Sequence, residues 1–423
     1  MRTLSKQNET DQAMSDAIVV AGAGQAAAQL VDSLRREGFK GPLIVVGEEP
    51  FLPYQRPPLS KKFLQGELER ERLFIRPASY YQQTQAEMRT GVRVTAIDRD
   101  RKTVSLSDGG KLEYAKLALT IGSQVRRIRL PGSDLAGIHY LRGIEDVDRI
   151  RAAAQPGKRL VVIGAGYIGL EVAATCRQLG LDVTVVEALD RVMSRVVAPV
   201  VSQFYAAQHA SHGVRIQCSA GVKALEGKGQ VEAVVLADGT RVPADFVVVG
   251  VGILPVTDIA EACGLKCDNG IAADEHCRTS DPDIFSFGDC ASFPSLRYGR
   301  RVRLESVDNA FEQAKTAAAT IMGRAVTHDK VPWFWSDQYD LKLLIVGLAE
   351  GYDQVVVRGD PSTKSFSVCY LKAGELLALD SINHPKDYMA ARKLIAERVK
   401  LEPSKLADPT IALKDCVAGT GIG

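Results

Sequence analysis

The chain has 423 residues, of which 46% are hydrophobic and 25% are charged, a composition typical of an ordinary globular protein with about two to four domains. Its 53 Lys and Arg residues nearly balance 51 Asp and Glu residues, which argues against bulk attraction to nucleic acid or to a membrane surface. Its apolar runs all fall short of the roughly 18 residues that a membrane-spanning helix needs.

The first residues, 1–13, read MRTLSKQNETDQA and lack the apolar segment of a secretory signal. We therefore expect them to form a disordered extension, with Met14 as an alternative start. The eight cysteines are scattered along the chain without a framework pattern. This usage predicts reduced thiols and a cytoplasmic location.

A first strand–turn–helix–strand pattern occupies residues 17–49, AIVVAGAGQAAAQLVDSLRREGFKGPLIVVGEE. It is typical of a βαβ dinucleotide-binding unit. Gly22 fits the tight turn after the strand, Gly24 lets the backbone approach a pyrophosphate, and Ala27 permits close packing of helix and sheet. Glu48 lies 26 residues after Gly22 and can accept hydrogen bonds from a ribose diol.

The same pattern recurs at residues 159–187, RLVVIGAGYIGLEVAATCRQLGLDVTVVE. Gly164, Gly166 and Gly169 take the three glycine roles, and Glu187 lies 23 residues after Gly164. An acid at that position would repel a ribose 2′-phosphate, although Arg191 is nearby, so the pattern favours NADH over NADPH. Two nucleotide sites in one chain suggest a flavoprotein, with FAD at the first site and NADH at the second.

Two further segments support a flavoprotein. Residues 113–126, EYAKLALTIGSQVR, resemble the strand and turn that lead from an FAD domain to an NADH domain. They read Thr120-Ile121-Gly122 where Ala-Thr-Gly is usual. Residues 281–291, DPDIFSFGDCA, resemble the segment whose aspartate, here Asp289, binds the ribityl chain of FAD.

Longer motifs make the resemblance closer. From residue 17 to about residue 414 the chain resembles FAD-dependent NADH:ferredoxin reductases of the putidaredoxin reductase type. The matching motifs are PPLSK, YLR, GAGYIGLEVAA, ADGTRVPAD, SDPDIFSFGDCA, LESVDNAFEQA and PWFWSDQY.

This resemblance implies an α/β fold with two Rossmann-like domains and an α+β C-terminal domain. The FAD domain is expected at 14–124 and 252–329, the inserted NADH domain at 125–251 and the C-terminal domain at 330–423. Strand-like runs KLLIVGLA and SFSVCYL near residues 343–380 agree with the last of these.

The resemblance also implies binding residues. It places FAD contacts at Ala26, Glu48, Lys61, Val94, Arg142, Asp289 and Val307, and Arg56 of the proline-rich stretch joins this set. It places NADH contacts at Gly164, Gly166, Ile168, Gly169 and Glu187, with Gly252 near the nicotinamide.

Three residues are the candidates for catalysis. Lys61 is expected near flavin N5, and Glu171 is expected to approach it from the NADH domain. An ammonium paired with a carboxylate there would favour negative charge on the reduced flavin. Trp335 corresponds to an aromatic near the flavin edge that faces the electron acceptor, whereas we expect Trp333 to be part of the core.

The segment 50–63, PFLPYQRPPLSKKF, has no cysteine at the position where disulfide reductases of this superfamily carry a CxxxxC pair. The first cysteine of the chain is Cys176, within the second dinucleotide unit. A thiol relay at the first domain is therefore excluded, so electrons must leave the flavin directly. Histidines and cysteines also lack metal-ligand spacing, and we expect no protein-bound metal.

The implied partner is an acidic [2Fe–2S] ferredoxin that serves a cytochrome P450 or similar oxygenase. It needs a basic docking face, for which Lys315, Lys342 and Arg301 are the candidates, with Arg300 and Arg303 beside the last. The resemblance implies a monomer.

Three alternatives stay open. A monodehydroascorbate-reductase-like enzyme would also lack the cysteine pair, whereas an NADH oxidase would need one. A cell-death-factor-like flavin-binding interaction protein would be expected to carry long basic stretches for nucleic acid, which the near-neutral charge disfavours.

Overall fold

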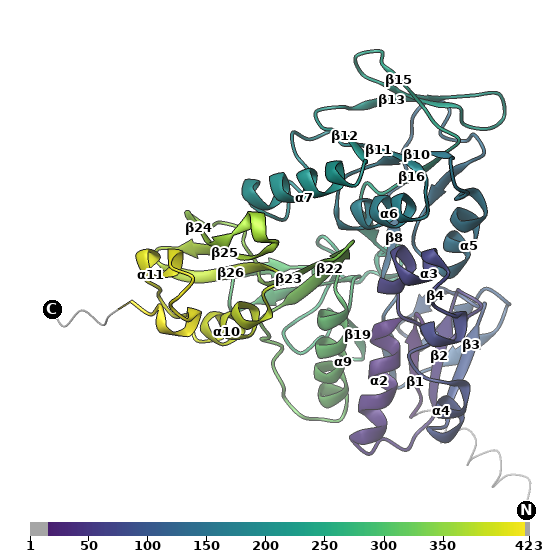
Figure 1. Cartoon of the computed structure of the whole chain (residues 1–423). Helices are drawn as coiled ribbons and strands as arrows, with labels where there is room; N and C mark the ends of the chain where they lie inside the picture. Colours follow the sequence, from purple (N-terminus) through teal and green to yellow (C-terminus); the bar gives the residue numbers. More distant parts are fainter. Residues whose placement is uncertain (1–15, 419–423) are drawn as a thin grey trace, which may run out of the picture. The chain divides into compact units, whose positions relative to one another are not determined.

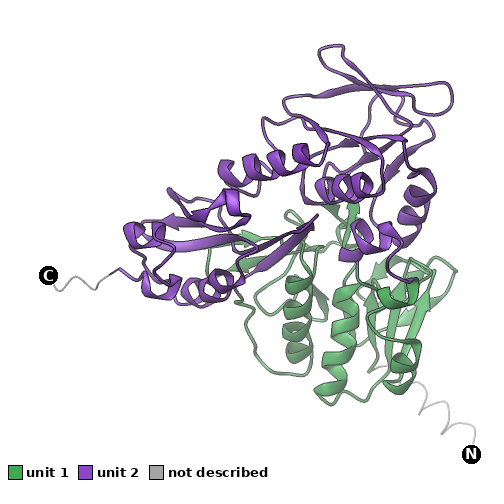
Figure 2. Cartoon of the chain, in the orientation of Figure 1, with its two compact units in different colours: residues 1–55, 70–124, 254–330 green, residues 56–69, 125–253, 331–423 purple. Residues whose placement is uncertain are grey.

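The computed structural model describes residues 16–418, so the expected extension at 1–13 and the alternative start at Met14 lie outside the described residues. The chain divides into two compact units (Figure 2). Unit 1 runs to residue 55 and resumes at 70–124 and 254–330, and unit 2 comprises 56–69, 125–253 and the chain from 331 onward. The chain passes between the units near β8 (Ser123–Val125) and β17 (Ile253–Pro255).

Within residues 16–418, unit 1 is built on a five-stranded parallel sheet in the order β19-β7-β1-β2-β3 (Figure 1). Its strands are β1 (Ile18–Ala21), β2 (Leu43–Gly47), β3 (Ala86–Thr90), β7 (Lys116–Leu119) and β19 (Ile284–Ser286). Because both faces of a parallel sheet are covered, the strands β1 and β2 read as continuous, buried apolar runs, whereas the edge strand β3 contains charged residues.

Alternate residues of β1 enter two different hydrophobic clusters. Ile18 and Val20 pack with the helices α2 (Gln25–Arg36) and α9 (Val307–Ile321), which lie side by side on one face. Val19 and Ala21 pack with the antiparallel sheet on the other face. That sheet consists of β4 (Val94–Asp98), β5 (Thr103–Leu106) and β6 (Lys111–Glu113).

The remaining elements of unit 1 are short. They are η2 (Arg70–Leu73), α4 (Ala78–Gln83), α8 (Asp258–Ala262), β18 (Ile271–Ala272), β20 (Ala291–Ser295) and β21 (Arg300–Val302).

The described part of unit 2 repeats the parallel arrangement in a second five-stranded sheet, ordered β12-β11-β10-β16-β9. Its strands are β9 (Ile138–Tyr140), β10 (Arg159–Ile163), β11 (Asp182–Val186), β12 (Arg215–Gln217) and β16 (Phe246–Val249). Its other elements are η1 (Pro57–Ser60), α3 (Lys62–Gln65), α5 (Ile144–Ala153), α6 (Tyr167–Gln178), α7 (Pro199–Ser211), β13 (Val222–Glu226), β14 (Ala233–Leu236) and β15 (Arg241–Pro243).

Unit 2 also holds a five-stranded antiparallel sheet, in the order β22-β23-β26-β25-β24 within the residues described. Its strands are β22 (Trp333–Gln338), β23 (Leu341–Gly347), β24 (Gln354–Asp360), β25 (Ser365–Lys372) and β26 (Glu375–Ile382). The segments that accompany it are η3 (Pro361–Thr363), α10 (Pro385–Ala396), α11 (Pro403–Ala407) and η4 (Leu413–Asp415).

The predicted fold class is confirmed, because the two βαβ units and the antiparallel C-terminal sheet are all present. The predicted boundaries at 14–124, 125–251, 252–329 and 330–423 stay a prediction. The helices of residues 16–418 are each too short or too polar to cross a bilayer.

Helix α7 packs on the antiparallel sheet within unit 2. The rings of Phe204 and Phe366 are 5.0 Å apart between centroids, and the Ala198 N–H donates to the Tyr370 hydroxyl at 2.8 Å. That hydroxyl in turn donates to the buried carboxyl of Asp380. Burial raises the pKa of Asp380 to about 7, and the Tyr370 hydroxyl only partly offsets this.

Asp380 makes stability depend on pH. The unfolded carboxyl ionises near its ordinary value of 3.8, and the folded carboxyl ionises near 7. The folded state therefore binds more protons between these values, so stability falls as pH rises from about 4 to 7, by up to about 4 kcal/mol. Asp380→Asn should remove this slope in thermal unfolding temperatures measured from pH 4.5 to 8.

The exposed carboxylate of Asp340 provides the control, since Asp340→Asn should leave the wild-type pH profile in place. Parallel profiles for wild type and Asp380→Asn would contradict the assignment.

Candidate functional site

Both predicted glycine turns require glycine. Gly22 has φ +102°, and a Cβ there would lie 2.3 Å from the Thr120 carbonyl oxygen. Gly164 has φ +103°, and a Cβ there would lie 2.5 Å from the Gly250 carbonyl oxygen. A side chain would therefore be strained by conformation and would clash with a neighbouring strand end, which explains why the sequence repeats glycine at both places.

Within residues 16–418, the helices that follow these turns begin without a side-chain cap. Among the described residues, neither Gly24 before α2 nor Gly166 before α6 has a side-chain cap, and the first turns carry no acid. A Cβ at either glycine would meet none of the described atoms within 4 Å. Uncapped N–H groups at a helix N-terminus, with open space beside the preceding glycine, fit a pyrophosphate, so each turn fits a dinucleotide.

The second glycine turn, which is predicted to bind NADH, is held in place by its predicted acid. The Glu187 carboxylate accepts hydrogen bonds from the N–H of Ala165 at 2.7 Å and of Leu189 at 2.9 Å. Gly169 is needed for close packing, since a Cβ there would lie 2.1 Å from the Gly164 carbonyl oxygen. Glu187 therefore lies against the glycine turn where a ribose would bind.

Arg191, the cation nearest in sequence, is engaged elsewhere. Its guanidinium donates to the Val197 carbonyl at 2.8 Å, to the Ser202 hydroxyl at 2.6 Å and to the Ser194 carbonyl at 2.8 Å. These bonds occupy guanidinium N–H donors that could otherwise bind a 2′-phosphate, which agrees with the predicted preference for NADH.

Two other predicted NADH contacts occupy open positions in unit 2. Ile168, in the first turn of α6, keeps 44% of its surface exposed. Gly252 has φ +99°, and a Cβ there would meet none of the described atoms within 4 Å. The side chain of Ile168 is therefore accessible to a ligand at the uncapped start of α6.

Two predicted FAD contacts of unit 1, Ala26 and Asp289, lie in adjoining segments. A Cβ on Gly288, the residue before Asp289, would lie 3.4 Å from the Ala26 Cβ, so the start of α2 adjoins the Asp289 turn. Ser123 Oγ donates to Asp289 Oδ2 at 2.9 Å. Sequence reasoning missed Ser123, although it lies within the segment 113–126 that resembles the passage between the two domains.

The other predicted FAD contacts of unit 1 differ in exposure. Glu48 is largely exposed, and its carboxylate lies 3.7 Å from the Arg93 guanidinium. Val94 is buried in the cluster between the two sheets, and Val307 opens α9 after the N-cap residue Ser306, whose hydroxyl accepts from Asn309 N–H.

In unit 2, the structure brings the predicted catalytic residues Lys61 and Glu171 together. Lys61 Nζ lies 2.7 Å from Glu171 Oε2, and Glu171 is 2% exposed. Ser60 Oγ donates to the same carboxylate oxygen at 2.5 Å, and Ser336 Oγ donates to Oε1 at 2.7 Å. Sequence reasoning missed both serines, although Ser336 is a polar residue at a buried position of a strand.

Trp335 is the residue next to Ser336 on β22. Its ring stacks on Trp333 at 5.4 Å between centroids, and both tryptophans are half-buried. The remaining predicted FAD contacts, Arg56 and Arg142, lie together in unit 2, because Arg56 Nη1 donates to the Arg142 carbonyl at 2.6 Å.

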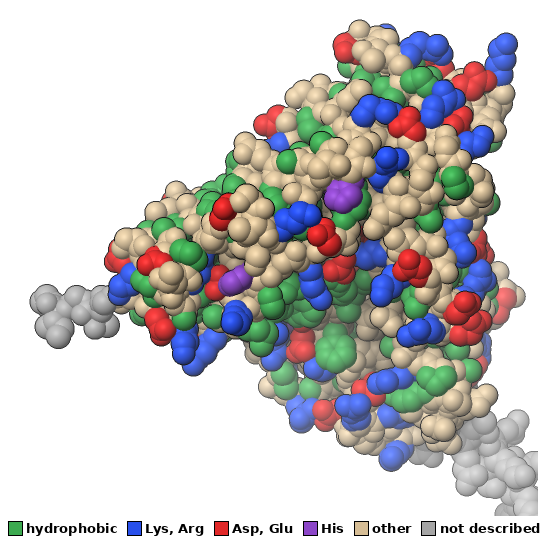
Figure 3. All heavy atoms as spheres, viewed as in Figure 1, with side chains coloured by type: hydrophobic (Ala, Val, Ile, Leu, Met, Phe, Trp, Pro, Cys, Tyr) green, Lys and Arg blue, Asp and Glu red, His purple; other side chains and the backbone are tan. Residues whose placement is uncertain are grey.

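The predicted docking cations have different surroundings. Arg301 donates to the backbone carbonyls of Ala273 and Ser292, so its guanidinium serves the fold of unit 1. Lys315 pairs with Glu312 at 2.8 Å and lies over the Phe311 ring. Lys342 is exposed on β23. Basic and acidic side chains are mixed over the face shown in Figure 3.

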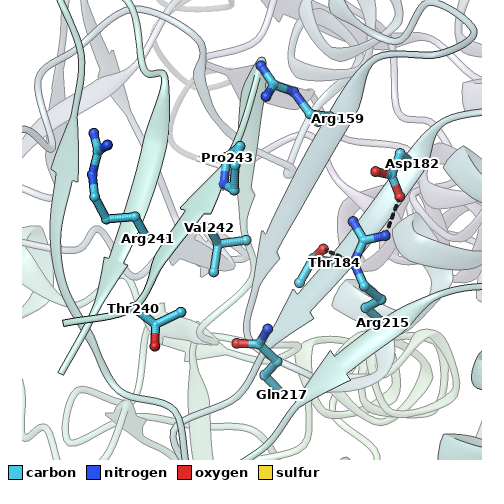
Figure 4. A pocket seen from close by; sticks show the side chains of 9 residues that line it. All are labelled: Arg159, Asp182, Thr184, Arg215, Gln217, Thr240, Arg241, Val242 and Pro243. Carbon is cyan, nitrogen blue, oxygen red and sulfur yellow. Dashed lines mark hydrogen bonds and ion pairs between the residues drawn. The ribbon is translucent and has the colours of Figure 1, made fainter. Parts of the chain in front are cut away.

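A separate pocket of about 400 Å³ lies in unit 2 beside the start of β10 and β11 (Figure 4). Arg159 and Arg215 in its lining pair with Asp245 and Asp182. Ligands of parallel α/β sheets bind outside the carboxyl ends of the strands, whereas this pocket lies toward their amino ends. It is therefore distinct from the predicted NADH site.

The cysteines do not form a redox pair in this structure. All eight lie within residues 16–418 and each is unpaired. Burial raises the pKa of Cys176 to about 12 and that of Cys267 to about 11, which makes thiolates unfavourable at neutral pH. Residues 16–418 also hold no group of three His, Cys, Asp or Glu side chains arranged for a metal ion.

Comparison with known proteins agrees with this geometry. A family model described as pyridine nucleotide-disulphide oxidoreductase matches residues 16–314, and one described as reductase C-terminal matches residues 333–417. Rhodocoxin reductase of Rhodococcus erythropolis is 44% identical over 95% of this chain and 94% of its own length.

Two solved structures are similar over nearly the whole chain. The covalent putidaredoxin reductase–putidaredoxin complex is 42% identical, with a TM-score of 0.92 over 95% of this chain and 98% of that chain. The ferredoxin reductase for the CYP199A2 system from Rhodopseudomonas palustris is 41% identical, with a TM-score of 0.92 over 95% of this chain and 100% of that chain.

The open space at Gly24 and Gly166 gives a selective prediction. Gly24→Ala should fold normally but lower the FAD content of the purified protein, because the added methyl would occupy the pyrophosphate position. Gly166→Ala should keep its FAD and raise the KM for NADH by about tenfold, a loss of about 1.4 kcal/mol in binding. Flavin absorbance per chain and steady-state kinetics measure the two effects.

The two variants serve as controls for each other. Equal effects of both substitutions on FAD and on NADH would contradict the assignment of one turn to each dinucleotide.

Proposed function

The chain belongs to the pyridine nucleotide-disulphide oxidoreductase family, and from this membership we propose that it works as an NADH-dependent ferredoxin reductase. Bound FAD supplies the chemistry that converts a hydride from NADH into single electrons for the ferredoxin. The first glycine turn and the Asp289 segment bind FAD, and the second turn with Glu187 binds NADH. In the proposed pathway the ferredoxin delivers electrons to a cytochrome P450 or similar oxygenase.

The observation that carries this proposal is the Lys61–Glu171 pair in a segment without cysteine. The resemblance places a CxxxxC pair at this position in the disulfide-using relatives. Here η1 and α3 instead present Lys61 against a buried carboxylate at 2.7 Å. Since the cysteines are unpaired and no thiol lies in this segment, an external carrier is the proposed electron acceptor.

The roles of individual residues follow from their positions. We assign Lys61 to the flavin, where its ammonium stabilises negative charge, and Glu171 to the orientation of that ammonium. Trp335 is assigned to the acceptor side. Its half-buried ring on β22 supports this role.

The proposed partner is an acidic [2Fe–2S] ferredoxin that docks on basic side chains. Lys342 is the best supported of these because it is exposed. Lys315 is also retained, whereas the guanidinium of Arg301 is occupied by backbone carbonyls. The unpaired cysteines support the proposed cytoplasmic location, and a monomer is proposed from the resemblance.

Lys61→Ala should slow the reduction of bound flavin by NADH by about tenfold or more, because it removes the positive charge that stabilises the reduced state. Stopped-flow absorbance measures this rate directly. The neighbouring Lys62 is exposed, and Lys62→Ala provides the matched control with an expected wild-type rate. An unchanged rate in Lys61→Ala would remove Lys61 from the mechanism.

Turnover with a panel of [2Fe–2S] ferredoxins tests the function itself, with cytochrome c reporting electrons that leave each carrier. The rate with the cognate ferredoxin should fall steeply with salt and in Lys342→Glu, because both weaken charge attraction. The rate of NADH oxidation with ferricyanide should change little. Efficient ferricyanide reduction without turnover of any ferredoxin would overturn the proposal.

A further inference from the structure

The carboxylate of Glu171 is held on both of its oxygens. Oε2 receives Lys61 Nζ and the Ser60 hydroxyl, and Oε1 receives the hydroxyl of Ser336 from β22. A carboxylate with 2% exposure depends on such partners, because water does not solvate it. From Oε1, a chain of hydrogen bonds runs through further buried polar side chains, to which the proposed function assigns no role.

The next link of this chain is Gln338. Ser336 is fully buried, and its hydroxyl donates to Glu171, so its oxygen must accept from another group. Gln338 Nε2 provides that donor at 3.1 Å. The opposite orientation of the amide would require Ser336 to donate to Gln338, which would leave Oε1 of Glu171 without its donor.

His209 of α7 continues the chain in the same direction. Its Nε2 lies 2.8 Å from Gln338 Oε1, which only accepts, so Nε2 must carry the proton. Burial lowers the pKa of His209 to about 4, so the ring is neutral at pH 7 and its Nδ1 accepts. The Tyr339 hydroxyl lies 3.2 Å from Nδ1 and is the donor there.

The donors Tyr339, His209, Gln338 and Ser336 therefore all point toward Glu171. Chains of hydrogen bonds with one direction polarise each other, so each bond strengthens the next. We propose that Ser336, Gln338 and His209 are positioning residues that hold Glu171 as the charged partner of Lys61. They connect α7 and β22 to the segment that carries the predicted flavin lysine, all within unit 2.

The effect of these residues on flavin reduction rests on the proposed role of Lys61. The chain of hydrogen bonds can be tested without measuring turnover. The first measurement is the histidine ring ¹⁵N spectrum of the holoenzyme at pH 8, with the six histidines assigned by single substitution. We expect His209 to carry its proton on Nε2. His212 provides an internal control with the proton on Nδ1, because its Nδ1 faces the Gln208 carbonyl at 2.8 Å.

The second measurement is the acetylation of Lys61 by acetic anhydride, quantified by mass spectrometry against the exposed neighbour Lys62. Ser336→Ala and Gln338→Leu should raise the rate at Lys61 by about three- to tenfold, since each removes a hydrogen bond that supports a charge. Ser367→Ala is the matched control, because Ser367 is also fully buried and its hydroxyl has no hydrogen-bond partner among the described residues.

Different results would overturn the inference. A proton on Nδ1 of His209 in the unsubstituted holoenzyme would reverse the direction of the chain. Unchanged labelling of Lys61 in Ser336→Ala and Gln338→Leu, or an equal rise in Ser367→Ala, would show that the chain does not position the pair. Absence of ferredoxin turnover by the unsubstituted enzyme would contradict the proposed function. It would not contradict the positioning role of Ser336, Gln338 and His209.

Discussion

The buried negative charge of Glu171 is the constraint on which unit 2 depends. A carboxylate removed from water is stable only with a nearby cation and donors for its oxygens. Here those groups come from η1 and from the adjacent Lys61 at the start of α3, and from β22, which lies far from both in sequence. To stabilise the Glu171 carboxylate, these segments must therefore keep their positions relative to one another.

A backbone constraint plays the corresponding role at the dinucleotide turns. In each unit a glycine with φ near +100° lies directly against a carbonyl of a neighbouring strand end, and a helix then starts without a side-chain cap. Packing fixes the conformation of the turn, while the first N–H groups of the helix have no side-chain cap among the described residues. The same local geometry therefore occurs twice, and each copy fits an anion such as a pyrophosphate.

Much of the fold could be predicted because its signals are local. In each βαβ unit the apolar runs, the glycine turn and the closing acid lie within about thirty residues. The structure has a strand, a helix and a second strand in the predicted order in both units. Lys61 and Glu171 were found only through a family resemblance, since their contact spans 110 positions and no spacing rule predicts it. Arg301 was predicted as a docking residue from its charge alone. The sequence does not reveal that its guanidinium donates hydrogen bonds to backbone carbonyls of unit 1.

The hydrogen-bond chain behind Glu171 was not predicted for the same reason. Ser336 and Gln338 are common polar residues, and His209 lies 129 positions before Gln338. One signal was available, namely that Ser336 and Gln338 alternate on a strand whose burial places both inside. Polar residues that repeat with period two on a buried strand face require partners, and this pattern can be read from a sequence once the strand is known.

The hydrogen bonds of Glu187 to the second glycine turn, the proposed NADH site, have a consequence for engineering coenzyme preference. Glu187 accepts two backbone N–H groups, so replacing it would leave two donors without an acceptor as well as removing a repulsive charge. Arg191 cannot simply turn toward a new phosphate, because it ties together the segment between β11 and α7. A variant that prefers the phosphorylated coenzyme would therefore need a new acceptor for the turn and a newly introduced cation, in addition to loss of the acid.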